Sequence, residues 1–231
     1  ENKTIFITGV GSKDFSVLAT DITPDIQLMF NGQCFPLKLS ESVGGVDNLF
    51  SNENLSTTIQ ESGLTRNFKK SISVSSILDT VSDDDIFNYI YSVLHSPNYR
   101  ERFKNNLIKE LPRIPFTNDF EKFKLWSGEG KKLVDLHLNY EKVKKFDCLF
   151  KEGDLRLANI EDAKSFYRVE KMKFAKKGYK STVIYNKNIT IENIPLEAYE
   201  YVVNGKPALE WVMDRQCVKT DKASGIVNDA N

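Results

Sequence analysis

The sequence predicts an α+β fold, and three observations carry that prediction. Short β-branched and aromatic runs fill the first third, apolar residues in the middle recur with helical spacing, and strand patterns return in the last third before one final helix. Strands and helices that follow each other in blocks are typical of α+β proteins. We therefore expect a single domain over 1–231, with a β-rich part (1–80), a central helical layer (81–145), and a basic β-hairpin region with a C-terminal helix (146–231).

The β-rich part is punctuated by turn residues. Asn31-Gly32 is a strong hairpin-turn pair, and the glycines of Gly9-Val10-Gly11 close the first strand as a turn. Residues 40–67 are rich in Ser, Asn, Gly and Thr, which predicts a long surface excursion. The expected strands lie at 4–8, 16–20, 26–30 and 33–35.

The middle of the chain carries helix start signals. Ser82 precedes three aspartates, and a hydroxyl cap followed by acidic residues satisfies and complements the first turn of a helix. Ser96-Pro97 starts a second helix, with proline at its first position. Asn118 is a candidate cap for a third helix, which runs to about Tyr140. The apolar stripes of these helices are expected to be core packing.

The last part is expected to hold strands around a basic hairpin. Lys176-Lys177-Gly178 is its predicted tip, and Asn186-Lys187-Asn188 is a second turn. The tail from 221 to 231 is small and polar, so we expect a loop or a frayed end. The expected strands lie at 165–174, 179–185 and 189–191, and the last helix at 209–214.

Common catalytic and cofactor motifs are missing from the sequence. There is no phosphate-binding loop, no GxGxxG and no GxSxG, and the two histidines, His95 and His137, are far apart and are expected to be structural. Glu129-Gly130-Lys131 has the acid-x-lysine spacing of some nucleases, but it falls in a predicted helix without a second acid to pair with it. We expect no catalytic residue, no metal and no cofactor, and we keep an independent nuclease as a weak alternative.

The cysteines and the hydropathy indicate the compartment. The three cysteines lie far apart without CxxC spacing, so we expect reduced core thiols in the cytoplasm. No apolar run approaches the roughly 20 residues of a membrane helix, and no signal peptide is recognisable. The chain begins at Glu1, so we expect a piece of a longer polypeptide.

Charge is distributed unevenly although the formal net charge is zero. Residues 1–63 hold three lysines against eight acidic residues, while 164–187 hold eight basic residues against Glu170 alone, with aromatic residues between them. Strand alternation would turn the aromatics inward and the bases outward, and such a basic face binds DNA phosphates. The candidate DNA-binding residues are Arg168, Lys171, Lys173, Lys176, Lys177, Lys180 and Lys187, with Arg215, Lys219 and Lys222 in a second, weaker segment.

A further set of polar residues has side chains suited to DNA contact. Asn186, Asn188 and Gln216 can read base edges, and Arg100, Arg102 and Lys104 can contact phosphates. The competing interpretation is that the basic stretch is a solvated surface, balanced by the acidic first third of the chain.

Several long strings resemble one protein family. In this order the chain carries YIYSVLHSPNYRERF (89–103), ELPRIP (110–115), DLHLNY (135–140), VNGKPALEWVMDR (203–215) and VKTDKASGIVND (218–229), and 8–12, 25–28 and 33–37 fit the same region. These strings resemble the C-terminal specificity region of type ISP restriction–modification enzymes. The resemblance covers nearly the whole chain.

The resemblance implies a DNA target-recognition domain that is itself non-catalytic. In that family one polypeptide also carries a nuclease, a motor and an adenine methyltransferase, whose motifs are absent here. The implied partners are duplex DNA and the methyltransferase and motor domains, and the implied state is a monomer. The domain would hold the duplex so that the target adenine can be flipped into the neighbouring catalytic pocket. The alternative is a structural coupling domain that binds the methyltransferase or motor rather than DNA.

Overall fold

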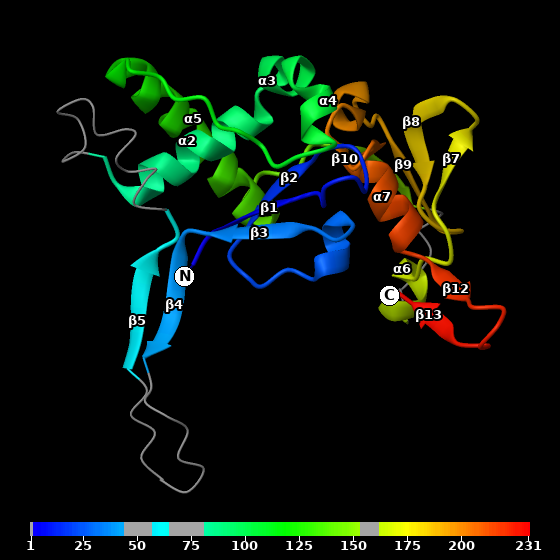
Figure 1. Ribbon diagram of the computed structural model, residues 1–231. Helices are drawn as coiled ribbons and strands as arrows, with labels where there is room; N and C mark the ends of the chain where they lie inside the picture. Colours follow the sequence, from blue (N-terminus) through cyan, green and yellow to red (C-terminus); the bar gives the residue numbers. More distant parts are fainter. Residues whose placement is uncertain (1, 44–56, 65–80, 153–161) are drawn as a thin grey trace, which may run out of the picture. The chain divides into compact units, whose positions relative to one another are not determined.

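The computed structural model describes residues 2–43, 57–64, 81–152 and 162–231. The chain divides into two compact units, Glu1–Val143 and Lys144–Asn231, and each has its own buried cluster. Helices and antiparallel sheets occur together, so the predicted α+β class is confirmed (Figure 1). That the two units act as a single recognition domain stays a prediction.

A three-stranded antiparallel sheet opens the first unit. It consists of β1 (Thr4–Ile7), β2 (Val17–Thr20) and β3 (Gln33–Pro36) in the order β2-β1-β3. The expected strand at 26–30 is wrong: this segment is the 3-10 helix η1 (Ile26–Met29). The Asp25 carboxylate accepts a hydrogen bond from the Gln27 amide at 2.6 Å, and such a cap favours a turn over an extended chain.

A separate two-stranded arm follows the sheet (Figure 1). Strands β4 (Lys38–Val43) and β5 (Thr57–Ser62) pair antiparallel, with Lys38 opposite Ser62 and Val43 opposite Thr57. The predicted excursion over 40–67 is therefore partly a β-ribbon. The rest of that prediction lies outside the described residues.

The helices of the first unit begin where the sequence indicates. Helix α2 (Asp83–His95) has a complete capping box, since the Ser82 hydroxyl accepts from the Asp85 amide at 3.1 Å and the Asp85 carboxylate accepts from the Ser82 amide at 3.0 Å. The cap of the third predicted helix is Asp119, not Asn118. The other elements are α3 (Pro97–Arg102), α4 (Lys104–Leu107), α5 (Phe120–Leu138) and η3 (Tyr140–Lys142).

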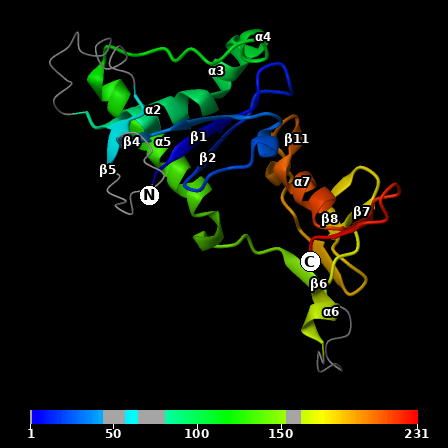
Figure 2. The ribbon, with the colours of Figure 1, turned by 60° about the horizontal axis from the view of Figure 1, so that its bottom comes forward.

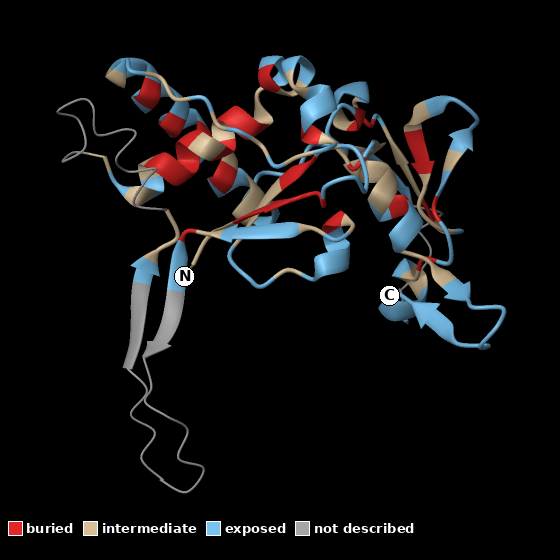
Figure 3. Cartoon of the chain, in the orientation of Figure 1, coloured by how far each residue is buried: buried red, intermediate tan, exposed pale blue. Residues whose placement is uncertain are grey.

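The core of the first unit joins the helices to the sheet. Tyr91 is fully buried, Ile86 and Val134 are 1% exposed, and Ile5 and Ile7 of β1 belong to the same cluster. Buried residues concentrate on α2 and β1 in Figure 3. The apolar stripes predicted for these helices are therefore core packing, as expected.

The second unit is built on a four-stranded antiparallel sheet with the order β6-β9-β8-β7 (Figures 1 and 2). The expected strand at 165–174 is wrong in its first half. Residues Ala163–Tyr167 form helix α6, because the Asp162 side chain caps the Ser165 amide at 3.2 Å. The strands are β6 (Leu149–Glu152), β7 (Lys173–Lys176), β8 (Tyr179–Ile184) and β9 (Ile189–Glu192).

The chain closes with short elements against this sheet. Val169, Val183 and Met213 are buried together in the core of the second unit. The elements are η4 (Leu196–Tyr199), β10 (Val202–Val203), β11 (Lys206–Pro207), α7 (Ala208–Arg215), β12 (Val218–Thr220) and β13 (Val227–Asp229).

The tail is a loop at 221–226, as expected, but the expectation is wrong for its end, which is paired and anchored. Strand β13 pairs with β12, and the Asn231 side chain accepts from the Val169 amide at 2.7 Å and donates to the Val169 carbonyl at 3.1 Å. This small polar sequence thus forms a strand because β12 offers a partner for pairing and the Val169 backbone offers hydrogen bonds to the last residue.

Two compositional expectations can be compared with the structure. All three cysteines are free, but Cys34 is exposed, and Cys148 and Cys217 are half-buried, so the expectation of core thiols is wrong for Cys34. Across the described ranges, no helix has the length and apolar character to cross a membrane.

Candidate nucleic-acid interface

The predicted basic hairpin is present in the second unit. Strands β7 and β8 pair antiparallel, with Lys176 opposite Tyr179, and Lys177-Gly178 forms the connecting turn. Gly178 has φ +79°, a left-handed conformation that glycine adopts without a steric cost. Lys176 and Lys177 are both exposed, so the hairpin presents two positive charges at its tip.

The aromatic residues of this region divide between the core and the surface. Phe174 and Tyr185 pack against the buried cluster, as alternation predicted. Tyr167 and Tyr179, in contrast, are 47% and 55% exposed, so the expectation of inward aromatics is wrong for them. An exposed tyrosine beside lysines offers a face for stacking as well as a hydroxyl.

One hollow gathers four of the ten predicted basic residues. We call it the basic hollow; its volume is about 370 Å³, and it lies beside β7 and the turn between β8 and β9. Lys171 and Lys173 point out from the same edge because they are two residues apart in extended chain. The residues that line the basic hollow are Ser165, Arg168, Glu170, Lys171, Lys173, Ile184, Asn186 and Lys187.

Arg168 is held by two carboxylates. Its guanidinium lies 2.9 Å from Glu170 and 2.7 Å from Asp229. Hydrogen bonds from Asn231 and Arg168 lower the pKa of Asp229 to about 2, so this carboxylate stays charged. Arg168 therefore fixes the end of α6 to β13, and much of its charge is neutralised.

Lys180 is similarly engaged. Its ammonium lies 2.7 Å from the Glu210 carboxylate and 5.0 Å from the centre of the Tyr199 ring. The remaining predicted lysines are exposed, and none forms an ion pair with another described residue. They are Lys171, Lys173, Lys176, Lys177, Lys187, Lys219 and Lys222.

The second predicted DNA-binding segment, which holds Arg215, Lys219 and Lys222, is divided among a helix, a strand and a turn. Arg215, in the last turn of α7, lies 5.5 Å from the Trp211 ring centre in a cation–π contact. Lys219 is on β12, and Lys222 is in the turn that leads to β13. Gln216 is the C-cap residue of α7, and its backbone N–H donates to the Val212 carbonyl at 2.9 Å.

Two expected base readers are committed to the fold. The Asn186 side chain donates to the carbonyls of Phe166 and Arg168 at 2.8 and 3.1 Å and accepts from the Asn188 and Ile189 amides at 2.8 Å. The Asn188 side chain donates to the Phe166 carbonyl at 3.0 Å. These amides tie α6 to the turn between β8 and β9; the Asn186 side chain is fully used by the fold, whereas Asn188 uses its amide nitrogen there.

A second hollow lies at the hairpin, and no sequence pattern indicated it. We call it the tip hollow; its volume is about 650 Å³. Two of its residues could not be identified as functional from the sequence. Asn193, which has φ +58°, appears there only as an asparagine after a predicted strand, and Thr182 appears only as one residue of a predicted strand. The residues that line the tip hollow are Ala175, Lys176, Lys177, Gly178, Tyr179, Ser181, Thr182, Glu192 and Asn193.

The nuclease alternative gains no support from the first unit. Glu129 pairs with Lys132 at 2.7 Å, and Lys131 pairs with Asp135 at 2.7 Å, both on the surface of α5. The residues described in the structure include no group of three or more His, Cys, Asp or Glu side chains placed to hold a metal ion.

The basic residues near α3 have partly structural contacts. Arg100 donates to the Leu94 carbonyl at 2.7 Å, and Arg102 lies 5.6 Å from the Phe103 ring centre. Lys104 is exposed and lines a small hollow of about 230 Å³ with Arg100. Phosphate contact by these residues stays a prediction.

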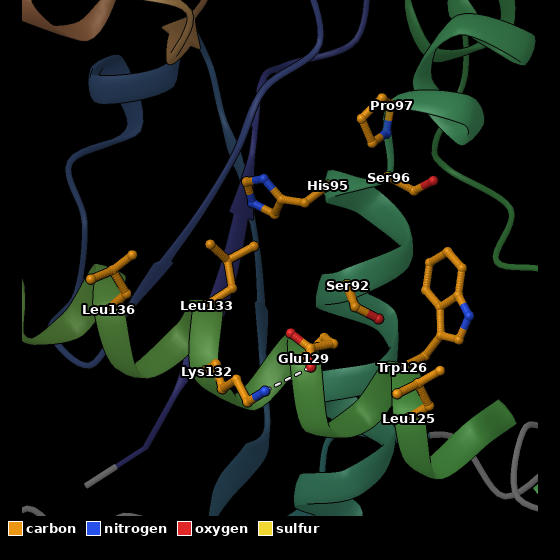
Figure 4. Close-up of a pocket in the computed structure, with 10 residues that line it drawn as sticks. All are labelled: Ser92, His95, Ser96, Pro97, Leu125, Trp126, Glu129, Lys132, Leu133 and Leu136. Carbon is orange, nitrogen blue, oxygen red and sulfur yellow. Dashed lines mark hydrogen bonds and ion pairs between the residues drawn. The ribbon is translucent and has the colours of Figure 1, made fainter. Parts of the chain in front are cut away.

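An apolar hollow of about 730 Å³ lies between α2 and α5 in the first unit (Figure 4). Leu125 and Leu136 of α5 are 63% and 47% exposed, and Trp126 is 37% exposed. Figure 4 shows His95 at the end of α2, above Leu133 and Leu136. The wall of this hollow is mainly hydrocarbon, which suits contact with protein better than contact with phosphate.

The two histidines, distant in sequence, meet beside this hollow. Their ring centres lie 5.4 Å apart, and the Tyr91 hydroxyl is hydrogen-bonded to His137 Nδ1. Burial, with the positive charge of Arg100 and the proximity of His137, lowers the pKa of His95 to about 3. Burial and Arg100 also lower the pKa of His137. The sequence prediction of structural histidines fits this neutral, packed pair.

The chain was compared with known proteins. It is similar over residues 1–231 to the family model described as the Type ISP C-terminal specificity domain. Comparison with curated proteins found no match.

Three solved structures resemble the chain closely. The first is a nuclease-deletion mutant of the Type ISP restriction-modification enzyme LlaGI with a DNA substrate mimic (38% identity, TM-score 0.73, 100% of this chain and 18% of that one). The second is the ATP-dependent Type ISP enzyme LlaBIII bound to DNA (36%, 0.78, 100% and 14%). The third is a DrdV–DNA complex (30%, 0.77, 98% and 21%).

The chain thus spans about a fifth or less of the length of these proteins. The similarity extends over the complete length of this chain at both the sequence and the fold level. The chain belongs to the Type ISP C-terminal specificity domain family.

Proposed function

We propose that this chain recognises a sequence in duplex DNA as the specificity domain of a restriction–modification enzyme, and so positions the target adenine for a neighbouring methyltransferase domain. The observation that carries the proposal is the set of exposed lysines on the second unit without ion pairs to other described residues. Four of them, Lys171, Lys173, Lys176 and Lys177, lie on β7 or the segments next to it, and Lys187 lies in the turn between β8 and β9, where it lines the same hollow as Lys171 and Lys173.

The arrangement of these lysines suits a duplex. Extended chain rises about 3.3 Å per residue, so Lys171 to Lys176 spans roughly 17 Å. A duplex carries about one negative charge per 1.7 Å of its axis, so phosphates are within reach along this whole edge. Unpaired lysines release counterions from DNA without first breaking an internal ion pair. Arg168 and Lys180, whose charges are engaged, contribute less in this proposal.

The family supports this function. The three solved structures described above contain DNA or a DNA substrate mimic. By this analogy the partners of the chain are duplex DNA and the methyltransferase and motor domains of its parent polypeptide. Its own role is recognition without catalysis, as a monomer and without a cofactor of its own.

Charge reversal at the hairpin tip tests the proposal. We expect Lys176→Glu with Lys177→Glu to weaken binding to random and to selected duplexes alike, and to lower the slope of log affinity against log salt by about 2. The measurement is fluorescence anisotropy of a labelled duplex over a salt series. Lys109→Glu with Lys145→Glu makes the same charge change at two exposed lysines outside the candidate set and is the matched control.

The results distinguish phosphate contact from other roles. Equal weakening by the control pair would mean that net charge, rather than this surface, governs binding. A changed sequence preference at unchanged affinity would contradict the assignment of the two lysines to phosphates.

The second candidate function is a structural coupling domain. The observation in its favour is the apolar hollow with Leu125, Trp126 and Leu136 exposed on α5. Under this alternative the chain binds its methyltransferase or motor partner and does not bind duplex DNA even at low salt. Binding of DNA with a steep salt dependence would reject it as the sole function.

A further inference from the structure

The tip hollow contains polar side chains that the fold does not use. Ser181, Thr182, Asn193 and Tyr179 line it, and none of their side chains forms a hydrogen bond with another described residue. Thr182 is only 9% exposed as a whole residue, but its hydroxyl is not among the buried unpaired polar atoms of the described residues, so the hydroxyl is accessible from the hollow. In contrast to the Asn186 side chain, these groups keep their donors and acceptors for a ligand.

The backbone presents Asn193 in a fixed and costly conformation. Its φ of +58° lies in the left-handed region, which non-glycine residues adopt uncommonly and asparagine tolerates best. The next residue is anchored, because the Ile194 amide donates to the Ser181 carbonyl at 3.0 Å. Asn193 is exposed, so its amide is held at the edge of the hollow rather than packed in the core.

The charges around the hollow separate two kinds of ligand group. Lys176 and Lys177 at the rim attract phosphate, while Glu192 on the wall repels it. Glu192 is also paired with Lys151 at 2.8 Å, which holds the carboxylate in place. A ligand with phosphates outside and neutral hydrogen-bonding edges inside fits this distribution. Duplex DNA presents this arrangement in a groove, and a two-stranded β-ribbon can enter the major groove.

We propose that the tip hollow reads base edges, with Asn193 and Thr182 as the specificity-determining residues. The proposal rests on the proposed function of DNA recognition and names the part of the surface that reads sequence. An asparagine amide matches the N6 and N7 groups of adenine, and a threonine hydroxyl can donate or accept at any base edge. Tyr179, 55% exposed at the mouth, lies where it can pack against the sugar or base beside the one being read.

The test separates base reading from overall affinity. Asn193→Gly removes the amide and suits the positive φ, and Thr182→Val removes the hydroxyl with little change of shape. Each variant of the 231-residue chain is used to select duplexes from a random pool, and its affinity for the unselected pool is measured. We expect affinity for the pool to stay within about twofold, while preference at one or two adjacent positions falls by about tenfold.

A matched control and three outcomes complete the design. Asn31→Gly makes the same change at another left-handed asparagine, in the first unit, and should alter neither measurement. If the unsubstituted chain selects a motif and both variants select it with the same preference, the tip hollow does not read bases, and DNA recognition still stands. If the unsubstituted chain binds but selects no motif, base reading is likewise rejected. If it does not bind DNA at all, the proposed function and this inference both fail.

Discussion

The environment of a single side chain in this protein combines neighbours that are close in sequence with others that are distant. The His95 ring contacts Tyr91 of its own helix α2 and Arg100 of the adjacent α3, and it also meets His137, 42 residues away on α5. Burial in the presence of a fixed positive charge favours the neutral imidazole. The consequence is a dependence of stability on pH that the sequence did not predict.

We expect the free energy of unfolding to fall as the pH is lowered from about 6.5 toward 3. In the folded chain the pKa of His95 is about 3, against an ordinary value of 6.5. Between these values the unfolded chain binds a proton that the folded chain excludes, so stability is complete above the upper value and is lost below it. The slope approaches about 1.4 kcal/mol per pH unit.

Urea titrations between about pH 4 and 8 measure this effect. His95→Gln keeps an acceptor for Arg100 but cannot titrate, so its slope over the window should be shallower. An identical slope in the variant would show that other groups cause the pH dependence. The pKa of His137 is lowered too, so some slope should remain.

At the scale of elements, the packing of α2 on α5 depends on one glycine. A Cβ atom at Gly130 would lie 1.9 Å from the Asn88 carbonyl oxygen of α2. The Glu129-Gly130-Lys131 string, whose spacing matches that of some nucleases, is thus accounted for by close contact between two helices. Its charged residues form ion pairs on the outer surface of α5.

Gly130→Ala should therefore destabilise the first unit by about 1–3 kcal/mol or more, because the two helices must separate. Gly128 lies on the same helix with nothing within 4 Å of the position that a Cβ atom would take, so it provides the control. Gly128→Ala should be neutral or stabilising by up to about 1 kcal/mol, through helix propensity. Thermal unfolding followed by circular dichroism measures both, and equal effects at the two positions would contradict the close-packing account.

At the scale of the whole molecule, the chain has two compact units with separate buried clusters. Each unit contains one of the two tryptophans, Trp126 in the first and Trp211 in the second. The fluorescence of a single-tryptophan variant therefore reports on one unit. This allows the independence of the units to be measured directly.

We expect Gly130→Ala to lower the urea midpoint seen by Trp126 in a Trp211→Phe background. The midpoint seen by Trp211 in a Trp126→Phe background should stay within error, because the altered contact belongs to the first core alone. A common shift of both midpoints would show that the two units unfold as one cooperative structure.

The sequence by itself determined the features that depend on neighbouring residues. The capping box at Ser82, the proline start of α3, the turn at Gly178 and the second hairpin strand, β8, all follow from local rules, and the structure confirms them. The excess of lysine between 164 and 187 was equally visible, and long strings indicated the family that the comparison confirms.

Only the tertiary structure decided which partner each group meets. Segment 26–30 forms a 3-10 helix that the Asp25 side chain caps, and the end of the polar tail pairs as a strand with β12. The Asn186 side chain donates its hydrogen bonds to the carbonyls of Phe166 and Arg168. The tertiary structure also distinguishes Arg168 and Lys180, whose charges are paired with carboxylates, from the exposed lysines that have no such pair among the described residues. The physical reason is that periodicity and capping are set within a few residues, whereas burial, charge neutralisation and hydrogen-bond satisfaction depend on groups brought together from distant positions in the chain.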